Sequence, residues 1–146
     1  MKNLALSSLL FLLCLPFANA QEAEKLLLKN LPLQGEQAVV VDLNNPVEIK
    51  RWKRSQVQVR LTIELPEQEW FLLKSLIRAH RYDVTAEKTP DGLRVSMPEV
   101  FRTVLYKGKP LAENIAIQVF LPKNVELKMP GSAISVSGNL TGIEKK

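Results

Sequence analysis

The sequence predicts a mainly β domain: a twisted antiparallel sheet or sandwich-like fold with one covering α-helix. Two stretches, residues 55–65 and 115–121, alternate apolar and polar side chains, which is the period of a half-buried strand. Asn, Pro and Gly residues separate the strand-like runs at short intervals and favour turns. One segment, residues 66–81, instead spaces its apolar residues by three and four, as an amphipathic helix does.

The first twenty residues have the pattern of a secretory signal peptide. MKNLALSSLLFLLCLPFANA begins with basic Lys2, continues with an apolar run over residues 9–17, and ends small-x-small. The run is shorter than the ~20 residues that a spanning helix needs, so a retained anchor helix is the weaker interpretation. Cys14 lacks the small neighbours of a bacterial lipoprotein site. We expect cleavage after Ala20, a periplasmic or secreted bacterial protein, and no membrane span afterwards.

The expected mature chain holds itself together without disulfides. Cys14 is the only cysteine, so none remains after cleavage, and stability must come from a hydrophobic core. The full chain has a net charge of +5, and the loss of Lys2 lowers this excess by one. Such a mild excess does not by itself specify a partner.

The β domain is expected over residues 38–129, after a flexible lead at residues 21–37. The lead has the composition of one or two helical turns at 22–30, and Pro32 and Gly35 then break any regular run. Strands are predicted at 39–43, 47–50 and 55–65. The last of these places five apolar side chains on one face: Val57, Val59, Leu61, Ile63 and Leu65.

The predicted helix at 66–81 begins with Pro66, which a first helical turn tolerates. Acidic residues near its start and basic residues near its end suit the helix dipole. Its apolar stripe is expected to pack on the sheet, with a membrane-surface role as the weaker alternative; the stripe consists of Trp70, Leu72, Leu73, Leu76 and Ile77.

The rest of the chain returns to strand patterns. Strands around 82–86 and 93–97 are joined by the tight turn Thr-Pro-Asp-Gly at 89–92. Further strands are predicted at 101–106, 115–121 and 125–129. Residues 130–146 are rich in Gly and Ser and are predicted to form a terminal β repeat.

Several of these segments resemble a family of exported bacterial β proteins of unknown function. VEIKRWKRSQVQVR is similar to that family's V-x-I-x-x-W-x-x-x-x-V-x-V strand–turn–strand, and LRVSMP and NIAIQVFLPKNVELKM resemble its Pro-stopped strands. The family is related to the auto-transporter adhesin head (GIN) domain, and the resemblance covers about residues 39–143. It implies a non-enzymatic, adhesin-like module of the cell envelope.

The tail SAISVSGNLTGIE resembles the first of the Gly- and Ser-punctuated repeats that longer relatives stack into a β-helix-like body. A single repeat cannot bury its own face, because neighbouring repeats supply the core. Either the helix-covered sheet carries the stability alone, or another chain caps residues 133–143. The second alternative makes the chain a structural subunit that forms oligomers through its terminal β edge.

The sequence favours binding over catalysis and implies no cofactor. His80 is the only histidine, so zinc or copper sites built from several His or Cys ligands are excluded within one mature chain. No G-x-S-x-G or phosphate-binding loop is present. A carboxylate-based hydrolase is the weaker alternative, with candidate acids Glu64, Glu67, Glu69, Asp83, Glu87 and Asp91.

One basic run around a tryptophan is the candidate binding site: Lys50, Arg51, Trp52, Lys53 and Arg54. Four cations beside an aromatic ring suit an anionic envelope polymer or lipid headgroup. The favoured alternative is a solvated hairpin end with Trp52 folded back against the sheet. Expected export argues against nucleic acid, and another protein remains a candidate partner.

Overall fold

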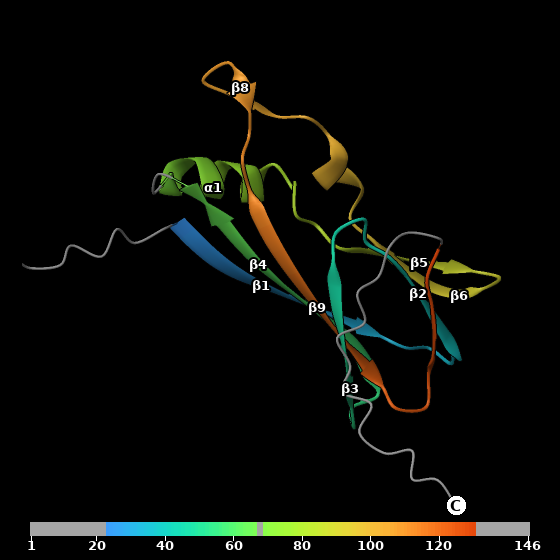
Figure 1. Ribbon diagram of the computed structural model, residues 1–146. Helices are drawn as coiled ribbons and strands as arrows, with labels where there is room; N and C mark the ends of the chain where they lie inside the picture. Colours follow the sequence, from blue (N-terminus) through green and yellow to red (C-terminus); the bar gives the residue numbers. More distant parts are fainter. Residues whose placement is uncertain (1–22, 67–68, 131–146) are drawn as a thin grey trace, which may run out of the picture.

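The computed structural model describes residues 23–66 and 69–130 (Figure 1). These residues form a mainly β domain with a single α-helix, which confirms the predicted fold class. The predicted signal peptide and residues 131–146 of the predicted terminal repeat lie outside the described residues, as does Glu67.

The first sheet has the strand order β1-β4-β9-β3. Its strands are β1 (Ala23–Pro32), β4 (Gln56–Leu65), β9 (Asn114–Pro122) and β3 (Val47–Trp52). β4 runs antiparallel to both neighbours, whereas β3 is parallel to β9. The alternation predicted for β4 is confirmed, because all five of its apolar side chains are buried.

The second sheet has the order β10-β2-β6-β5. Its strands are β10 (Glu126–Lys128), β2 (Ala38–Asp42), β6 (Gly92–Ser96) and β5 (Thr85–Thr89). β10 and β6 are both parallel to β2, so the two sheets are mixed and not antiparallel throughout. The run Ala-Val-Val-Val of β2 is buried on both faces, as a central parallel strand usually is. β10 is an edge strand that leads toward the tail, and pairing of this edge with another chain stays a prediction.

β1 corrects the prediction of a flexible lead at residues 21–37. It pairs with the whole of β4, from Ala23 opposite Leu65 to Pro32 opposite Gln56. Ala23 is 0 % exposed, Leu31 is 6 % exposed and Leu27 between them is half-buried, so every fourth side chain of β1 packs against the core. Three consecutive leucines at 26–28 obscure this period in the sequence, and Pro32 is tolerated because β1 is an edge strand.

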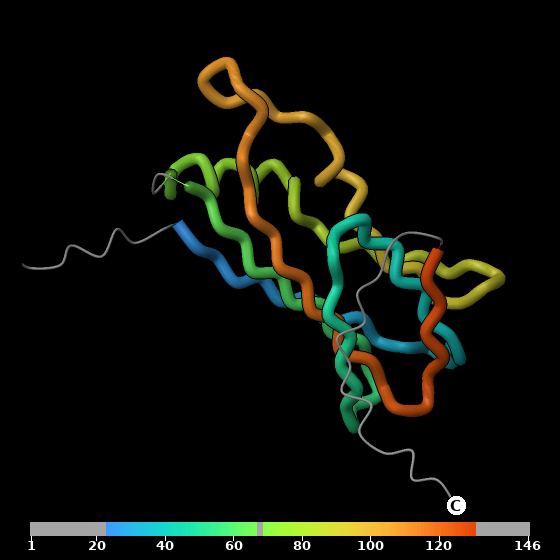
Figure 2. The backbone as a smooth tube through the Cα atoms, in the orientation of Figure 1, coloured from blue at the N-terminus to red at the C-terminus, as the bar shows by residue number. Residues whose placement is uncertain are grey.

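The helix α1 (Trp70–Arg78) is shorter than the predicted 66–81 and covers the inner face of the first sheet above β1 and β4 (Figures 1 and 2). Leu73 and Leu76 are buried in the same hydrophobic cluster as the strands. Trp70 was expected in this buried stripe, but its side chain is 41 % exposed. The helix therefore attaches through its leucines and leaves its aromatic residues outside.

The predicted turn at 89–92 joins β5 and β6 as an antiparallel hairpin. Gly92 has φ 129°, and a Cβ there would lie 2.3 Å from the carbonyl oxygen of Ala38, so only glycine fits. The predicted strand at 101–106 is wrong in its first part. Pro98–Phe101 form a 3₁₀ helix that begins at proline, and only β7 (Leu105–Tyr106) is extended, paired with β8 (Lys109–Pro110).

One hydrophobic cluster joins both sheets and the helix. Figure 2 shows the chain crossing between the sheets after β2 and again after β9. Val39 and Val95 of the second sheet belong to the same cluster as Val59 and Val119 of the first, so the two sheets share a single core.

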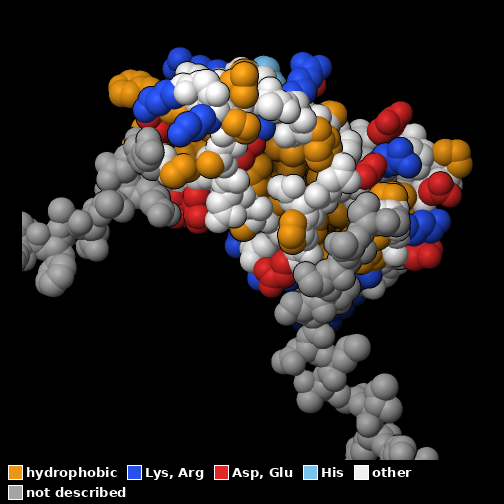
Figure 3. All heavy atoms as spheres, turned by 45° about the horizontal axis from the view of Figure 1, so that its top comes forward, with side chains coloured by type: hydrophobic (Ala, Val, Ile, Leu, Met, Phe, Trp, Pro, Cys, Tyr) orange, Lys and Arg blue, Asp and Glu red, His pale blue; other side chains and the backbone are white. Residues whose placement is uncertain are grey.

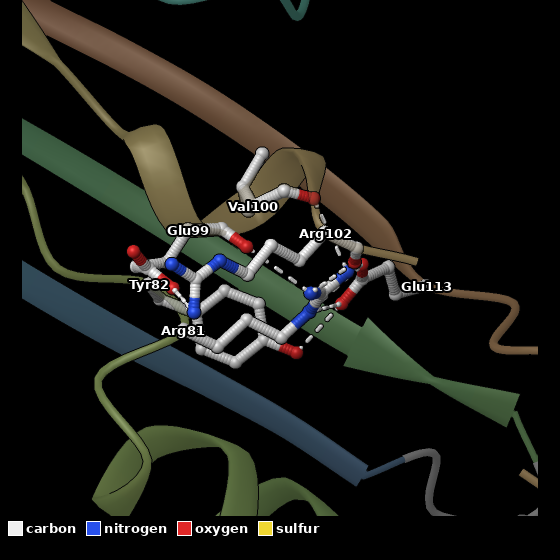
Figure 4. Close-up of polar contacts among 6 residues, drawn as sticks. All are labelled: Arg81, Tyr82, Glu99, Val100, Arg102 and Glu113. Atoms are coloured by element: carbon white, nitrogen blue, oxygen red, sulfur yellow. Dashed lines mark hydrogen bonds and ion pairs between the residues drawn. The ribbon is translucent and has the colours of Figure 1, made fainter. Parts of the chain in front are cut away.

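A buried ion pair holds the irregular connections together (Figure 4). The Arg81 guanidinium, in a residue 7 % exposed, donates to both carboxylate oxygens of Glu113 and to the carbonyl oxygens of Glu99, Val100 and Arg102. The sequence analysis assigned Arg81 to the basic end of the helix, but Arg81 lies three residues beyond the end of α1.

Tyr82 completes this network by donating its hydroxyl to Glu113 at 2.7 Å. Burial, followed by this bond to the carboxylate, raises the pKa of the Tyr82 phenol well above its usual range. The bond to Glu113 likewise raises the pKa of Arg81. The network therefore stays in its neutral-phenol, charged-guanidinium form at physiological pH.

The leucines of β1 allow a test of whether this strand belongs to the folded core. Leu31→Ala should lower the free energy of unfolding by about 2–5 kcal/mol, because it leaves a cavity in the core. Leu28→Ala, at a side chain 55 % exposed, should stay within about 0.5 kcal/mol of the wild type. Urea unfolding followed by circular dichroism measures both, and equal small effects would mean that residues 23–32 do not contribute to the core.

The ion pair can be tested with one conservative substitution. Glu113→Gln leaves the Arg81 charge buried without its counter-charge and should cost about 3–5 kcal/mol of unfolding free energy. The same change at exposed Glu126 is the control and should cost no more than about 0.5 kcal/mol. Chemical unfolding curves that coincide for the two variants would contradict the structural role of the pair.

Candidate binding surface on the outer face of the first sheet

The outer face of the first sheet carries the side chains that alternate with its buried valines and leucines. Strand register sets them in rows. One row runs across β4, β9 and β3 through Gln58, Phe120 and Lys50. The next runs through Arg60, Gln118 and Glu48. Residues far apart in the chain therefore become neighbours on one surface.

The structure divides the predicted basic run. Lys50 stands in the outer row, but Arg51, the next residue along β3, is directed elsewhere. Its Nη1 donates to the carbonyl oxygens of Pro122 at 2.9 Å and Val125 at 2.5 Å, which fastens the β9–β10 turn. Arg51 thus has a structural role, and Lys53 lies exposed in the turn that follows β3.

Trp52 lies against the sheet, as the structural alternative predicted. Its Nε1 donates to the carbonyl oxygen of Gln56 at 2.9 Å, which closes the turn between β3 and β4. Its ring centroid is 5.3 Å from that of Phe120, at an interplanar angle of 39°. Such tilted aromatic pairs are favourable and fix the position of both rings.

Three cations surround the two rings. The Arg60 guanidinium carbon is 5.0 Å and the Lys50 Nζ 5.7 Å from the Phe120 centroid, and the Arg54 guanidinium carbon is 5.1 Å from the Trp52 centroid. These are cation–π distances. We call this group the cation–aromatic cluster; it consists of Lys50, Trp52, Arg54, Arg60 and Phe120.

Sequence reasoning missed Arg60 and Phe120, although each has a recognisable signal. Arg60 occupies a polar position of the alternating strand, and Phe120 is a large aromatic at an outward position between two buried residues, Val119 and Leu121. Only the register of β4, β9 and β3 brings these two side chains to the basic turn.

Hydrogen-bonded polar side chains border the cluster. Glu48 accepts from Gln118 Nε2 at 2.6 Å and lies 3.3 Å from Lys50 Nζ. The hydrogen bond from Gln118, together with the hydrogen bond and the charge of Lys50, holds the pKa of Glu48 below its usual value. On the other side, Gln58 Nε2 donates to Asn30 Oδ1 at 2.8 Å. Among the described residues, Glu48 is therefore the one carboxylate that forms an ion pair with a cation of the cluster.

An open groove of about 740 Å³ continues from the cluster along the same face. Arg60, Glu48 and Gln118 line its cluster end, and Thr62 and Ala116 lie further along. Glu24 also lines this groove, so Arg60 is the one cation among its described lining residues, beside two carboxylates.

The acids proposed for hydrolase chemistry lie on separate elements. Glu64 accepts from Asn114 at 2.9 Å, and Glu69 accepts from Tyr106 at 2.6 Å, a bond that lowers the pKa of Glu69. Asp83 pairs with exposed His80 at 2.8 Å. Glu87 and Asp91 are exposed. These contacts do not test the hydrolase alternative, which stays a prediction from the sequence.

No protein-family model matches the chain, and no curated protein matches it. A solved structure described as a "putative cell adhesion protein" from Clostridium sporogenes is similar at a TM-score of 0.40 and 14 % identity, over 73 % of this chain. The chain spans 45 % of that structure's length. A likeness at this level carries no argument about fold or function.

Within residues 23–66 and 69–130, no helix has the length and apolar character needed to cross a membrane.

The polar border of the cluster can be tested by titration. Gln118→Ala removes the strongest influence that favours the Glu48 carboxylate, so the pKa of Glu48 should rise toward its ordinary value. Lys50→Gln should raise it as well, because it removes a hydrogen bond and a nearby positive charge. Carbon-13 NMR of the Glu48 carboxyl measures both shifts, and an unmoved pKa in Gln118→Ala would contradict the described row.

Proposed function

We propose that this chain is a non-enzymatic, adhesin-like binding module, exported to the bacterial cell envelope, that holds an anionic envelope polymer on the cation–aromatic cluster. The observation that carries the proposal is the gathering of three cations and two aromatic rings on the outer face of one sheet. The signal-peptide pattern and the family resemblance support export.

The charges of the cluster are available to a partner. Arg54 and Arg60 have no carboxylate within ion-pair distance among the residues described, and only Lys50 is shared with an acid, Glu48. An anionic chain that approaches this face therefore meets positive potential that the protein does not neutralise itself. A guanidinium offers paired donors that match a carboxylate or phosphate group.

The rings position these cations before any ligand arrives. Trp52 is held by its bond to Gln56, and Phe120 is held near the end of β9, where the strand is paired with both β4 and β3. Arg54 and Arg60 lie over these fixed rings, so less side-chain entropy is lost on binding than for freely moving arginines. A polymer with repeated acidic groups can span the three cations of the cluster, whereas the carboxylates of Glu24 and Glu48 in the adjoining groove disfavour its continuation there.

The proposal is tested by retention on an immobilised polyuronate, eluted with salt. The variant Lys50→Gln/Arg54→Gln/Arg60→Gln should bind at least about tenfold more weakly, because each charge-assisted hydrogen bond contributes roughly 1.5–3 kcal/mol. Retention of the wild type should fall as salt rises, since the interaction is electrostatic.

The matched control removes three exposed cations outside the cluster, in Lys25→Gln/Arg94→Gln/Lys123→Gln. It has the same net charge as the cluster variant and should keep most of the wild-type retention. Equal losses in the two variants would mean that net charge, and not the cluster, controls binding. Circular dichroism confirms that both variants are folded.

A further inference from the structure

The solvent face of α1 carries two aromatic side chains that the core does not use. Phe71 is 86 % exposed, on the side of the helix opposite buried Leu73 and Leu76, and Trp70 is 41 % exposed at the border between the two sides. Large exposed apolar side chains that lie together on one surface usually mark an interaction site. The cluster on the outer sheet face does not include this surface.

Basic side chains share that helix face. Lys74 lies one turn from both Trp70 and Phe71, and Arg78 lies one turn further on. Among the described residues neither cation has an ion-pair partner, and α1 contains no acidic residue. The exposed face therefore combines aromatic rings with uncompensated positive charge.

The adjacent β7–β8 hairpin extends this surface. Its Leu105 is 65 % exposed, and exposed Lys109 lies opposite Tyr106 in the paired strand. Tyr106 and Lys107 both donate to Glu69 at the start of α1, at 2.6 and 3.2 Å, which attaches the hairpin to the helix. Figure 3 shows hydrophobic side chains interspersed with Lys and Arg over this end of the molecule.

The chain also enters the fold at this end. Ala23, the first residue of β1, pairs with Leu65, which lies shortly before α1. The first described residue therefore lies at the same end of the domain as the start of α1.

We propose that the exposed face of α1, together with the β7–β8 hairpin, docks on an anionic lipid surface. We call this the α1 face; it consists of Trp70, Phe71, Lys74, Arg78, Leu105 and Lys109. Aromatic side chains insert at the headgroup level of a bilayer, and lysine and arginine bind anionic headgroups. Lysine is depleted at protein–protein interfaces, so the interleaved cations favour lipid over a protein partner.

The test is co-sedimentation of the mature chain with vesicles of phosphatidylglycerol and phosphatidylcholine at low salt. Binding should be strong to these vesicles, weak to phosphatidylcholine alone, and reduced by added salt. Trp70→Ser/Phe71→Ser should bind at least about tenfold more weakly, because two aromatic insertions are lost. Lys74→Gln/Arg78→Gln should lose about fivefold per cation.

Two matched variants act as controls. Leu26→Ser/Leu28→Ser removes two exposed apolar side chains from the outer sheet face, at 49 % and 55 % exposure, and should bind vesicles like the wild type. Arg94→Gln/Lys123→Gln removes one arginine and one lysine outside the α1 face and should bind the anionic vesicles at least half as well as the wild type. A blue shift of tryptophan emission on binding, present in Trp52→Phe, would place Trp70 at the bilayer.

Three results would overturn the inference. The first is no binding of the wild type to anionic vesicles at low salt. The second is unchanged binding by Trp70→Ser/Phe71→Ser. The third is a self-association, seen by light scattering, that this double variant abolishes while vesicles are not bound; the face would then belong to a second copy of the chain. Because the cluster variant of the outer sheet face leaves the α1 face intact, polymer binding and lipid binding can fail independently.

Discussion

The buried Arg81–Glu113 pair is the interaction on which the arrangement of this domain depends. It joins the segment after α1, the 3₁₀ helix and the start of β9, three connections with irregular backbone. Buried carbonyl groups in such connections need donors, and one guanidinium supplies them for three residues. Without this pair, the connection from α1 to β9 would lose the hydrogen bonds that fix its position. This matters for the whole first sheet, because β9 lies between β4 and β3.

The sequence predicts the elements of this fold better than their partners. Strict alternation predicts β4 and β9, because each buries one face and exposes the other. β1 was missed, because three adjacent leucines do not alternate. The parallel pairings of β2 and β3 could not be predicted, since they depend on which sheet each strand joins. Arg81 was missed because its partners lie 18 to 32 residues away.

The candidate site was half predicted for the same reason. Lys50, Trp52 and Arg54 are close in the sequence, so composition alone indicates them. In an extended strand, neighbouring side chains point to opposite faces, and this geometry sends Arg51 away from Lys50. Arg60 of β4 and Phe120 of β9, which come from two other strands, complete the cluster in place of Arg51. A contiguous basic run on a strand therefore overestimates the charge on any one face.

The parallel pairing of β3 with β9 also controls when the outer face can exist. Glu48 and Gln118, which meet across these strands, are 70 residues apart in the chain. Contacts of such long range form late, because a large loop must close first. During synthesis from the N-terminus, the turn that carries Lys53 and Arg54 is made early, whereas Phe120 and Gln118 are made near the end of the domain. The finished surface therefore appears only when nearly the whole domain is available, which delays recognition until folding is almost complete.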